Sequence, residues 1–486
     1  MLFNSYVFIF AFLPIMLIGY FWLLRRRLIL GSKIWLVGGS LFFYGYWNVI
    51  YVPLLLFSIL VNFFTGSALA NTGTLKITRK RFLLFGLLFN IALLAYFKYT
   101  DFFLENFNGI FGSNIPLPHI ILPLGISFFT FTQIAFLVDA YKNEAKEYDL
   151  LRYMLFVTYF PHLLAGPILH HKEMMPQFAN KWNFAVRWRN MAIGLFLFSI
   201  GLFKKVVIAD TFAGWANAGF DASVPLSFIE AWITSLSYTL QLYFDFSGYT
   251  DMAIGMSLMF NIRLPINFNS PYKAKDIQDF WRRWHITLSR FLKDYIYIPL
   301  GGNKVSRFRN YMNLFSVFLI GGIWHGASWM FVIWGALHGI AIVVHRIWKD
   351  LGFTMWGWVG WLITFNFVNI AWIFFRAENW EMAIKILSPM VGLNGILLPT
   401  VLSNKLAFLE SFGIQFGNWL ANVNMHASKD LGIFTAVLLL VLVGKNTQEL
   451  VIKFQSGWLY KVMTGFVLGI SIIMLHRISQ FIYFNF

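Results

Sequence analysis

The stretch LFNSYVFIFAFLPIMLIGYFWLL, residues 2–24, indicates the class of fold, because about 20 apolar residues in a helix are enough to cross a bilayer. No Lys or Arg precedes it, and Arg25, Arg26 and Arg27 follow it directly. A signal peptide has positive charge before its apolar core and a small-residue cleavage site after it. We therefore expect a permanent membrane helix that begins outside the cytoplasm and ends inside it.

The composition of the 486-residue chain agrees with a membrane protein. Hydrophobic residues make up 58% and charged residues 12%, about half the charged share of an average soluble domain. Membrane proteins keep Lys and Arg on the cytoplasmic side of their spans, which explains the net charge of +17. We therefore expect contact with membrane lipids and no nucleic-acid partner. The absence of cysteine excludes disulfides, thiolate metal sites and a cysteine nucleophile.

Further apolar segments recur along the chain, and two crossings after Arg27 return it to the cytoplasm at the basic segment KITRKR, residues 76–81. We expect about ten to twelve spans in all. The segments are 2–24, 34–47, 51–70, 82–97, 120–141, 191–208, 228–244, 311–324, 329–347, 358–375, 431–443 and 462–475. We find no internal repeat, long linker or soluble domain, so the sequence predicts an all-α, polytopic transmembrane bundle forming a single domain over residues 1–486.

Three stretches do not have the pattern of simple spans. Residues 153–177 are rich in Pro, Gly and His, and irregular backbone at membrane depth is tolerated only inside protein or beside a water-filled cavity. Residues 276–297 have a helical pattern but too many charges to face lipid, so they should lie at an interface or within the protein. Residues 382–420 predict a loop with short surface helices. We thus expect interfacial and re-entrant helices besides the spans.

The segment GGIWHGASW, residues 321–329, places His325 at a break between two apolar runs. Its glycines allow backbone to lie close to a ligand, and Trp324 and Trp329 can wall a narrow slot. A neutral imidazole there could accept a hydroxyl proton. The alternative is a histidine that is hydrogen-bonded within a helix kink, and local sequence alone leaves both interpretations open.

A second polar segment, DFWRRWHITLSR at residues 279–290, has His285 four residues after Trp281, so a continuous helix would put both on one face. Arg282 and Arg283 offer forked donors for a phosphate or carboxylate group. The alternative is an interfacial helix whose basic residues meet lipid head groups and whose tryptophans lie at the membrane boundary. The pattern supports the two interpretations equally.

Two carboxylates near the end of an apolar run form a third group, in QLYFDFSGYTD at residues 241–251. Asp245 and Tyr249 are spaced i,i+4 and so share a helix face. Paired carboxylates suit metal ligation or acid–base chemistry. The favoured alternative is that Asp245 and Asp251 pair with nearby Arg residues or cap helices, since buried carboxylates usually have partners.

The other histidines give weaker indications. The segment at residues 160–178 carries His162, His170, His171 and Glu173. Neighbouring histidines on a helix point apart, and without an i,i+4 pair or an HExxH motif we expect no metal site. His338 and His345 share one face of a predicted span, where either could face a cavity. The sequence has no Walker A, GxGxxG or GxSxG motif to support ATP-driven transport, a dinucleotide cofactor or hydrolase chemistry.

Four long motifs together resemble the bacterial branch of the membrane-bound O-acyltransferase family. They are FDFSGYTDMAIG (244–255), NFNSPY (267–272), DFWRRWHITLSRFLKDYIYIPLGGN (279–303) and GGIWHGASW (321–329). Four further segments are similar to the alginate O-acetyltransferase group within that family. They are MLFNSYVFIFAFLP (1–14), FPHLLAGPILHH (160–171), IAWIFFRA (370–377) and FIYFNF (481–486). The resemblance thus runs from the first residue to the last.

This resemblance implies a helical bundle around a central funnel or tunnel, in the cytoplasmic (inner) membrane of a bacterium. Members of the family accept an acyl thioester such as acetyl-CoA on the cytoplasmic side, without a tightly bound cofactor, and pass the acyl group outside. Related members acetylate alginate, peptidoglycan or cellulose, and a sister group transfers D-alanine toward teichoic acid. The alginate group works with a separate periplasmic acetyltransferase of the SGNH-hydrolase type. The family's essential histidine falls on His325, and a second position, often Asn or His, falls on His285.

These observations combine into one hypothesis, an O-acyltransferase that moves an acetyl group across the membrane for an exported cell-envelope polysaccharide. His325 would be the catalytic base, or a transient acyl carrier, and His285 would assist on the donor side. The expected substrate-binding residues are Trp281, Arg282, Arg283, Trp324, Asp245 and Tyr249. The alternative is a transporter or flippase for an envelope glycan or lipid precursor, but it should show a two-half symmetry that the sequence lacks. A purely structural scaffold would make His325 dispensable.

Overall fold

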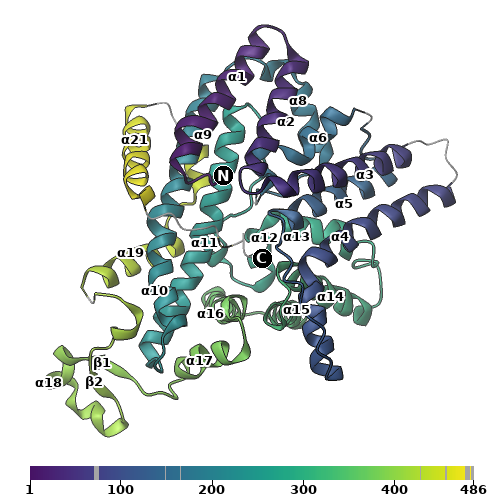
Figure 1. Cartoon of the computed structure of the whole chain (residues 1–486). Coiled ribbons are helices and arrows are strands. Elements are labelled where there is room, and N and C mark those ends of the chain that lie inside the picture. The colour runs from purple at the N-terminus through teal and green to yellow at the C-terminus, as the bar shows by residue number, and fades with distance from the viewer. Residues whose placement is uncertain are drawn as a thin grey trace.

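The computed structural model describes residues 1–70, 76–147, 149–164, 166–426, 428–454, 457–476 and 482. These residues form 21 α-helices, with short 3₁₀ and π-helical turns between them, and one two-stranded parallel sheet. The terminal motif FIYFNF, residues 481–486, lies outside the described residues apart from Ile482. The helical architecture in Figure 1 confirms the predicted fold class.

The helices follow one another along the chain with mostly short connections. The first group is α1 (Leu13–Arg25), which a π-helical turn at Phe8–Phe12 precedes, α2 (Ile29–Gly45), α3 (Val52–Ala70), α4 (Lys76–Phe111), α5 (Ile126–Tyr141), α6 (Leu150–Thr158), α7 (Phe160–Leu163), α8 (His171–Ala179), α9 (Trp188–Phe203) and α10 (Asp210–Asp221). The second group is α11 (Phe228–Met259), α12 (Ile277–Arg283), α13 (Ile286–Leu292), α14 (Arg307–His325), α15 (Trp329–Asp350), α16 (Gly357–Arg376), α17 (Trp380–Met390), α18 (Ser403–Leu406), α19 (Lys429–Val443), α20 (Thr447–Ile452) and α21 (Trp458–Ile473).

Seven helical stretches of the described residues are long and apolar enough to cross a membrane. They are Phe8–Arg25, Val49–Ala70, Ile77–Phe111, Trp188–Asp221, Trp329–Asp350, Gly357–Arg376 and Trp458–His476. Helices α2 and α5 are apolar but shorter, and the 32-residue α11 carries Glu230, Asp245 and Asp251. Every predicted span overlaps a helix, although length and composition alone support fewer crossings than expected.

Helices α9 and α10 pack along α11 on one side of the bundle (Figure 1). A Cβ atom at Gly194 would lie 2.6 Å from the Gly255 carbonyl oxygen, and one at Gly201 would lie 2.5 Å from that of Gly248. Small residues allow such close crossings in a membrane, where van der Waals packing has to replace the hydrophobic driving force between helices. Most residues of α11 are buried, so this helix forms the centre of the protein.

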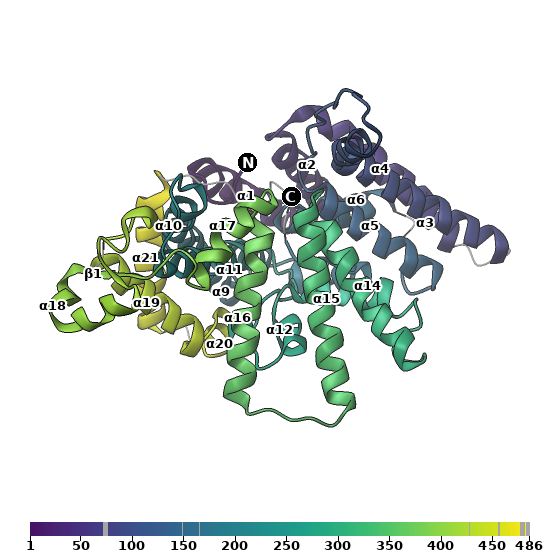
Figure 2. The same ribbon diagram turned by 90° about the horizontal axis from the view of Figure 1, so that it is seen from below.

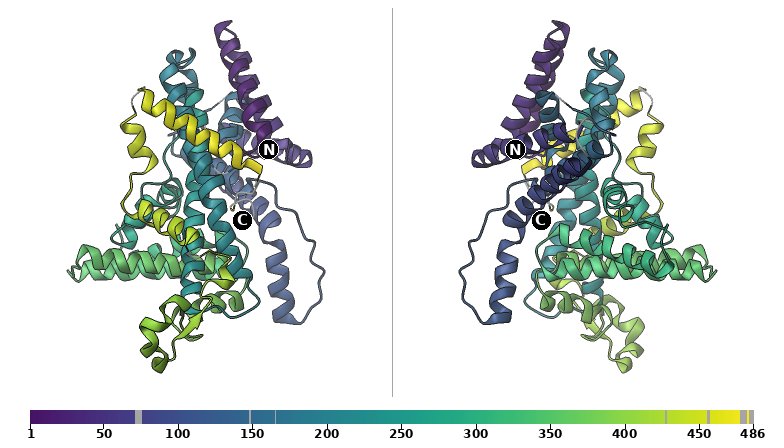
Figure 3. Two further views of the ribbon diagram at one scale, coloured as in Figure 1. Left: turned by 90° about the vertical axis from the view of Figure 1, so that its left-hand side faces the viewer. Right: turned by 90° about the vertical axis from the view of Figure 1, so that its right-hand side faces the viewer.

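Helices α14 and α15 form a hairpin, and α16 packs beside α15. α15 and α16 are seen end-on in Figure 1 and lengthwise in Figure 2, so they run across the direction of α11, as the side views in Figure 3 also show. A Cβ atom at Gly322 would lie 2.5 Å from the Phe331 carbonyl oxygen, and one at Gly335 would lie 2.7 Å from that of Phe318. These glycines allow the two backbones to touch, and the turn that joins the helices follows directly after His325.

The polar stretch of residues 276–297 buries mainly its apolar side chains within the protein and leaves Arg282 and Lys293 exposed, and it is not one continuous helix. α12 ends at Arg283, Trp284 is extended, and His285 has a left-handed backbone with φ of +42° before α13 begins. The predicted shared helix face of Trp281 and His285 is therefore wrong, because the helix that it requires is interrupted between them.

The region predicted as a loop with short surface helices contains more regular structure. After α17, the strand β1 (Leu397–Pro399) pairs in parallel with β2 (Gln415–Gly417). Helix α18 and two 3₁₀ turns connect the strands. The small sheet lies at the edge of the molecule, beyond α10 and α17, and is a minor addition to the helical bundle (Figure 1).

Candidate active site

His325 is the last residue of α14 and lies among aromatic side chains. Its ring centroid is 4.9 Å from that of Trp324 and 5.1 Å from that of Trp334 on α15. The ring centroid of Phe375 on α16 is also 5.1 Å from that of His325. Only 4% of His325 is exposed. Such walls keep water away from the imidazole and favour its neutral form, because a charged ring would lose its hydration.

Two further histidines belong to the same cluster. His338 on α15 contacts Trp334, with ring centroids 4.7 Å apart, and its Nδ1 accepts a 3.2 Å hydrogen bond from Trp281 Nε1. This bond makes Nδ1 the acceptor and leaves the proton of a neutral His338 on Nε2. His285 lies edge-on to Trp324, with centroids 6.5 Å apart. We call this group the histidine–tryptophan cluster, and its members are His285, His325, His338, Trp281, Trp324 and Trp334.

Several polar atoms of the cluster have no hydrogen-bond partner within the described part of the chain. They are both ring nitrogens of His285, Nε2 of His338, and Nε1 of Trp324 and of Trp334. Buried polar groups are nearly always paired, so donors and acceptors left over around one imidazole suit the binding of a polar substrate. The left-handed backbone of His285, uncommon for a residue with a side chain, is a second indication of a functional position.

A cavity of about 710 Å³ lies next to His325. Residues 326–328, which follow His325 in the chain, contribute to its lining, as do Phe331 and Phe375. Because Phe375 lines the cavity and also contacts the His325 ring, the imidazole is one layer of side chains away from the cavity. The predicted catalytic residue is thus buried but has a cavity beside it.

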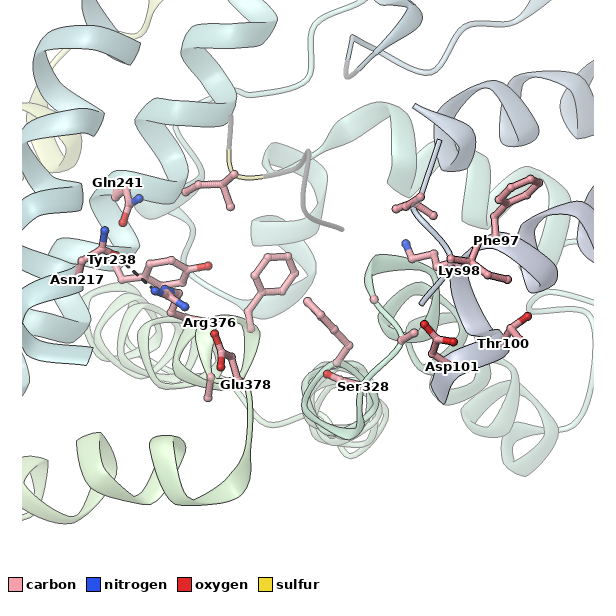
Figure 4. A pocket seen from close by; sticks show the side chains of 18 residues that line it. Phe97, Lys98, Thr100, Asp101, Asn217, Tyr238, Gln241, Ser328, Arg376 and Glu378 are labelled. Atoms are coloured by element: carbon pink, nitrogen blue, oxygen red, sulfur yellow. Dashed lines mark hydrogen bonds between the residues drawn. The ribbon is translucent and has the colours of Figure 1, made fainter. Parts of the chain in front are cut away.

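The cavity has charged side chains on two facing walls (Figure 4). Arg376 and Glu378 lie on one side, together with Gln241, whereas Lys98 and Asp101 lie on the other. Binding sites commonly combine an apolar wall with a few polar groups that fix the orientation of the ligand. This mixed lining suits a molecule that carries hydroxyl groups.

Two neighbouring side chains of α4 hold the end of α14. Lys98 Nζ donates to the carbonyl oxygens of Trp324, at 2.6 Å, and His325, at 3.0 Å. Tyr99 OH donates to the carbonyl oxygen of Ile323 at 2.6 Å. The last carbonyl groups of a helix have no partner within the helix, so these contacts satisfy three of them in succession.

The sequence analysis did not select Lys98 and Tyr99, because the predicted span of residues 82–97 stops just before them. The helix continues to Phe111, and the candidate span that contains it begins at Ile77. A lysine within a membrane helix suggests a function by default, and that signal was present in the sequence.

The two arginines that we expected to bind substrate lie at the end of α12, beside the cluster but not in it. Arg282 is exposed, and Arg283 forms an ion pair with Asp279 at 2.9 Å. Trp281, their neighbour in the helix, is buried in the cluster. Arg282 is therefore open to a charged ligand or a lipid head group, and its predicted role in donor binding stays a prediction.

Asp245 and Tyr249 are buried on α11 and have partners outside the cluster. Asp245 forms an ion pair with Lys205 at 2.6 Å, and its Oδ2 accepts a 2.9 Å hydrogen bond from the Ile482 amide. Tyr249 stacks on Phe3, with ring centroids 4.5 Å apart. Structural pairing therefore describes Asp245, although the partner is a lysine and not an arginine, and the substrate-binding roles of both residues stay predictions.

Two of the three histidines of residues 160–178, His170 and His171, belong to a separate polar group, whereas His162 Nε2 lies 2.9 Å from the Phe156 carbonyl oxygen. Tyr295 OH donates to Asp139 Oδ1 at 2.7 Å and lies 2.8 Å from His170 Nδ1. His171 Nε2 is 3.4 Å from Glu147 Oε2. Both histidines therefore have a carboxylate close by, and neither lines the cavity next to His325.

Comparisons with known proteins identify the family of the chain. Residues 40–383 match the model of the membrane-bound O-acyltransferase family. The chain is 50% identical to a peptidoglycan O-acetyltransferase from Helicobacter pylori, over 100% of this chain and 98% of the relative. It is 41% identical to a "Probable alginate O-acetylase" from Pseudomonas aeruginosa, over 79% of this chain and 73% of the relative. A teichoic acid D-alanyltransferase from Bacillus subtilis is 28% identical, over 54% of this chain and 72% of the relative. These matches confirm the resemblance that the motifs predicted.

Proposed function

This chain belongs to the membrane-bound O-acyltransferase family, and we propose that it transfers an acetyl group from a cytoplasmic thioester toward hydroxyl groups of peptidoglycan. It is a multi-pass membrane O-acetyltransferase of an envelope polysaccharide. We choose peptidoglycan as the acceptor because the chain is 50% identical over its whole length to a peptidoglycan O-acetyltransferase. The alginate relative is 41% identical over a smaller share of the chain, which makes alginate the second choice.

The position of the cavity along the helices suits the acceptor side of the reaction. α4 begins in the basic segment that we expect in the cytoplasm, and Phe97, Lys98, Thr100 and Asp101 in its later half line the cavity. α14 begins at Arg307, near Arg309, and ends at His325, directly before the cavity-lining Gly326. In the bacterial cytoplasmic membrane, this arrangement would open the cavity toward the side where peptidoglycan lies.

In this proposal His325 is the general base. The acceptor oxygen attacks the carbonyl carbon of the thioester while the imidazole takes the hydroxyl proton. The carbon–sulfur bond then breaks, and the thiolate receives the proton back from His325. The products are an acetyl ester and a free thiol, so atoms and charges balance without a tightly bound cofactor. Acetyl-CoA is the proposed donor.

The neighbours of His325 would assist the transfer. The indole N–H groups of Trp324 and Trp334 can donate to the thioester oxygen as negative charge develops on it. His285, with both ring nitrogens available within the described residues, can orient the donor. The aromatic walls exclude water, which would otherwise hydrolyse the thioester. The further expected contributors are Trp281 in the wall, Arg282 and Arg283 at the donor phosphates, and Asp245 and Tyr249 behind the site.

We further propose that a separate extracytoplasmic acetyltransferase of the SGNH type takes part in the last transfer. Peptidoglycan is a large polymer, whereas the His325 ring is buried and separated from the cavity by a layer of side chains. A partner that carries the acetyl group from the cavity to the polymer would bridge this separation.

A deletion strain tests the proposed function. Peptidoglycan is purified from the wild type, the deletion strain and the complemented strain, and the acetate released by mild base is measured per amount of peptidoglycan. We expect the acetate to disappear on deletion and return on complementation while the amount of peptidoglycan stays the same. Unchanged acetate would refute peptidoglycan as the acceptor, whereas a loss of the polymer itself would favour a transporter.

A further inference from the structure

We propose that Lys98 is a positioning residue that holds His325 in place for acetyl transfer, and this inference rests on the function proposed above. The ammonium group of Lys98 binds the carbonyl oxygens of Trp324 and His325, the last two residues of α14. It lies in the wall of the cavity, opposite Arg376 and Glu378 (Figure 4). One cation on α4 thus joins the backbone of the expected catalytic residue to the cavity that the acceptor would enter.

All three N–H groups of the ammonium have acceptors. Besides the two carbonyl groups, Lys98 Nζ donates to Ser127 Oγ on α5 at 3.3 Å. The Nζ atom also lies 5.9 Å from the centroid of the Trp324 ring. A lysine with its donors occupied in this way acts through the groups that it holds and not by direct contact with the reacting atoms. We therefore assign Lys98 a role in positioning His325 and none in the chemical step.

The end of α14 needs such an anchor for two reasons. A helix ends in carbonyl groups without internal partners, and burying them unpaired would cost free energy. The helix also carries a partial negative charge at this end, which a cation stabilises. Lys98 meets both needs beside a histidine whose ring packs against aromatic side chains.

The glycine contact between α14 and α15 does not fix the tip of the hairpin. Gly322 touches α15 one turn before His325, but the chain leaves the helix directly afterwards and is extended at Gly326. The position of the imidazole therefore depends on what holds the backbone at residues 323–325. Tyr99 and Lys98 hold these three carbonyl groups, and the Trp329 Nε1 group that follows donates to Asn106 Oδ1 at 2.8 Å.

The decisive variant is Lys98→Met, which keeps an unbranched side chain and removes the ammonium. Turnover is measured in inside-out membrane vesicles with radiolabelled acetyl-CoA as the probe, and amide hydrogen exchange is measured on residues 318–330 of the purified protein. We expect kcat to fall about tenfold to a hundredfold with the KM for acetyl-CoA changed less than about twofold, because a misplaced catalytic group slows the reaction and not the binding. Amide exchange at the end of α14 should become faster.

Two conservative variants separate positioning from a general need for a side chain. Lys98→Arg should recover part of the turnover, because a guanidinium can also donate to two carbonyl oxygens. Lys98→Gln, which has two amide N–H donors in place of three and no charge, serves if Lys98→Met does not accumulate in the membrane, and it should also lower kcat with KM unchanged.

Lys273→Met is the matched control. Lys273 Nζ donates to the carbonyl oxygens of Val443 and Gly444 at the end of α19, a helix that contributes nothing to the histidine–tryptophan cluster. The Lys273→Met variant loses the same kind of lysine–carbonyl contact at the end of a helix away from the cluster, so its kcat should stay within about twofold of the wild type. An equal loss of kcat in Lys273→Met would attribute the effect to a general loss of helix ends and refute the inference.

The results distinguish this inference from the proposed function. Wild-type turnover in Lys98→Met would overturn the positioning role, even with faster amide exchange at the end of α14. Wild-type turnover in His325→Ala would instead overturn the proposed catalytic base, and with it the reason for a positioning residue. Low kcat in both variants, with faster exchange in Lys98→Met, supports both.

Discussion

The protein holds two groups of buried histidines in opposite ways. His170 is 6% exposed and lies beside the Asp139 carboxylate and the Tyr295 hydroxyl, in a group that does not line the cavity. His325 is 4% exposed and lies among the rings of Trp324, Trp334 and Phe375, one layer of side chains from the cavity. Burial alone therefore does not distinguish the two.

The difference lies in what surrounds each ring. A carboxylate and a hydroxyl both lie at Nδ1 of His170 and fix the position of its ring, which is what a structural histidine requires. Aromatic walls give shape and exclude water, and the indole N–H groups of Trp324 and Trp334, which have no partner among the described residues, remain as donors for a ligand. We therefore expect the environment of a buried histidine, more than its depth, to separate a structural role from the catalytic role proposed for His325.

The comparison is tested most strongly by His325→Ala. Loss of the general base should lower acetyl transfer about a thousandfold, within the range that acid–base groups contribute, while the protein stays folded. Peptidoglycan acetate in the complemented strain and turnover in membrane vesicles measure the effect. A thermal unfolding midpoint close to that of the wild type shows that the fold is intact. Normal acetylation by a folded His325→Ala protein would contradict the assignment.

His285→Ala tests whether the second histidine of the cluster shares the role. We expect turnover to fall about tenfold to a hundredfold, because the donor loses a group that orients it near His325. His285→Asn should retain more activity, since the family resemblance implies that Asn is accepted at this position. Steady-state kinetics with acetyl-CoA would show the difference, and equal activity of the Ala and Asn variants would speak against an orienting side chain.

His170→Ala should separate the two groups by affecting stability and not catalysis. The change removes one of the two partners of Tyr295 and leaves polar groups buried, so we expect a loss of about 1–3 kcal/mol in the free energy of unfolding. The activity per folded molecule should stay within about twofold of the wild type, as for a site away from the reaction. Thermal unfolding in detergent and turnover normalised to folded protein measure both quantities. A large fall in specific activity would remove the distinction between the groups.

The smallest effect is expected from Arg282→Ala, at the edge of the histidine–tryptophan cluster. Arg282 is exposed, so its attraction for donor phosphates is screened by solvent and salt. The KM for acetyl-CoA should rise about two- to fivefold at low salt, with kcat unchanged and the difference reduced at high salt. Arg283→Ala is the matched comparison, because Arg283 already pairs with Asp279. If the KM for acetyl-CoA is unchanged in both variants, the predicted donor binding is wrong, and contact of both arginines with lipid head groups is favoured.

The helical bundle, the break after His325 and the family were predictable from the sequence, because each depends on local patterns. Apolar length indicates membrane helices, and GGIWHGASW has a break that is visible within nine letters. The break at His285 was not predictable, since neither Gly nor Pro marks it and a left-handed histidine is uncommon.

The contacts that complete the site depend on residues far apart in the chain. Lys98 meets His325 across 227 positions, and Lys205 meets Asp245 across two different helices. A short stretch of sequence does not show which cation will contact which carbonyl oxygen or carboxylate. A charge inside an apolar run nevertheless indicates that a partner exists, and a systematic search for such residues would have selected Lys98.

The touching backbones of Gly322 and Gly335 make the hairpin of α14 and α15 behave as one stiff arm. Two helices in direct backbone contact cannot slide or part without losing that contact along its length. The arm meets the neighbouring α4 at its tip, where Lys98 and Tyr99 hold the carbonyl groups of residues 323–325. A methyl group introduced at residue 335 would push α14 and α15 apart and so displace the imidazole of His325, although it does not contact that ring.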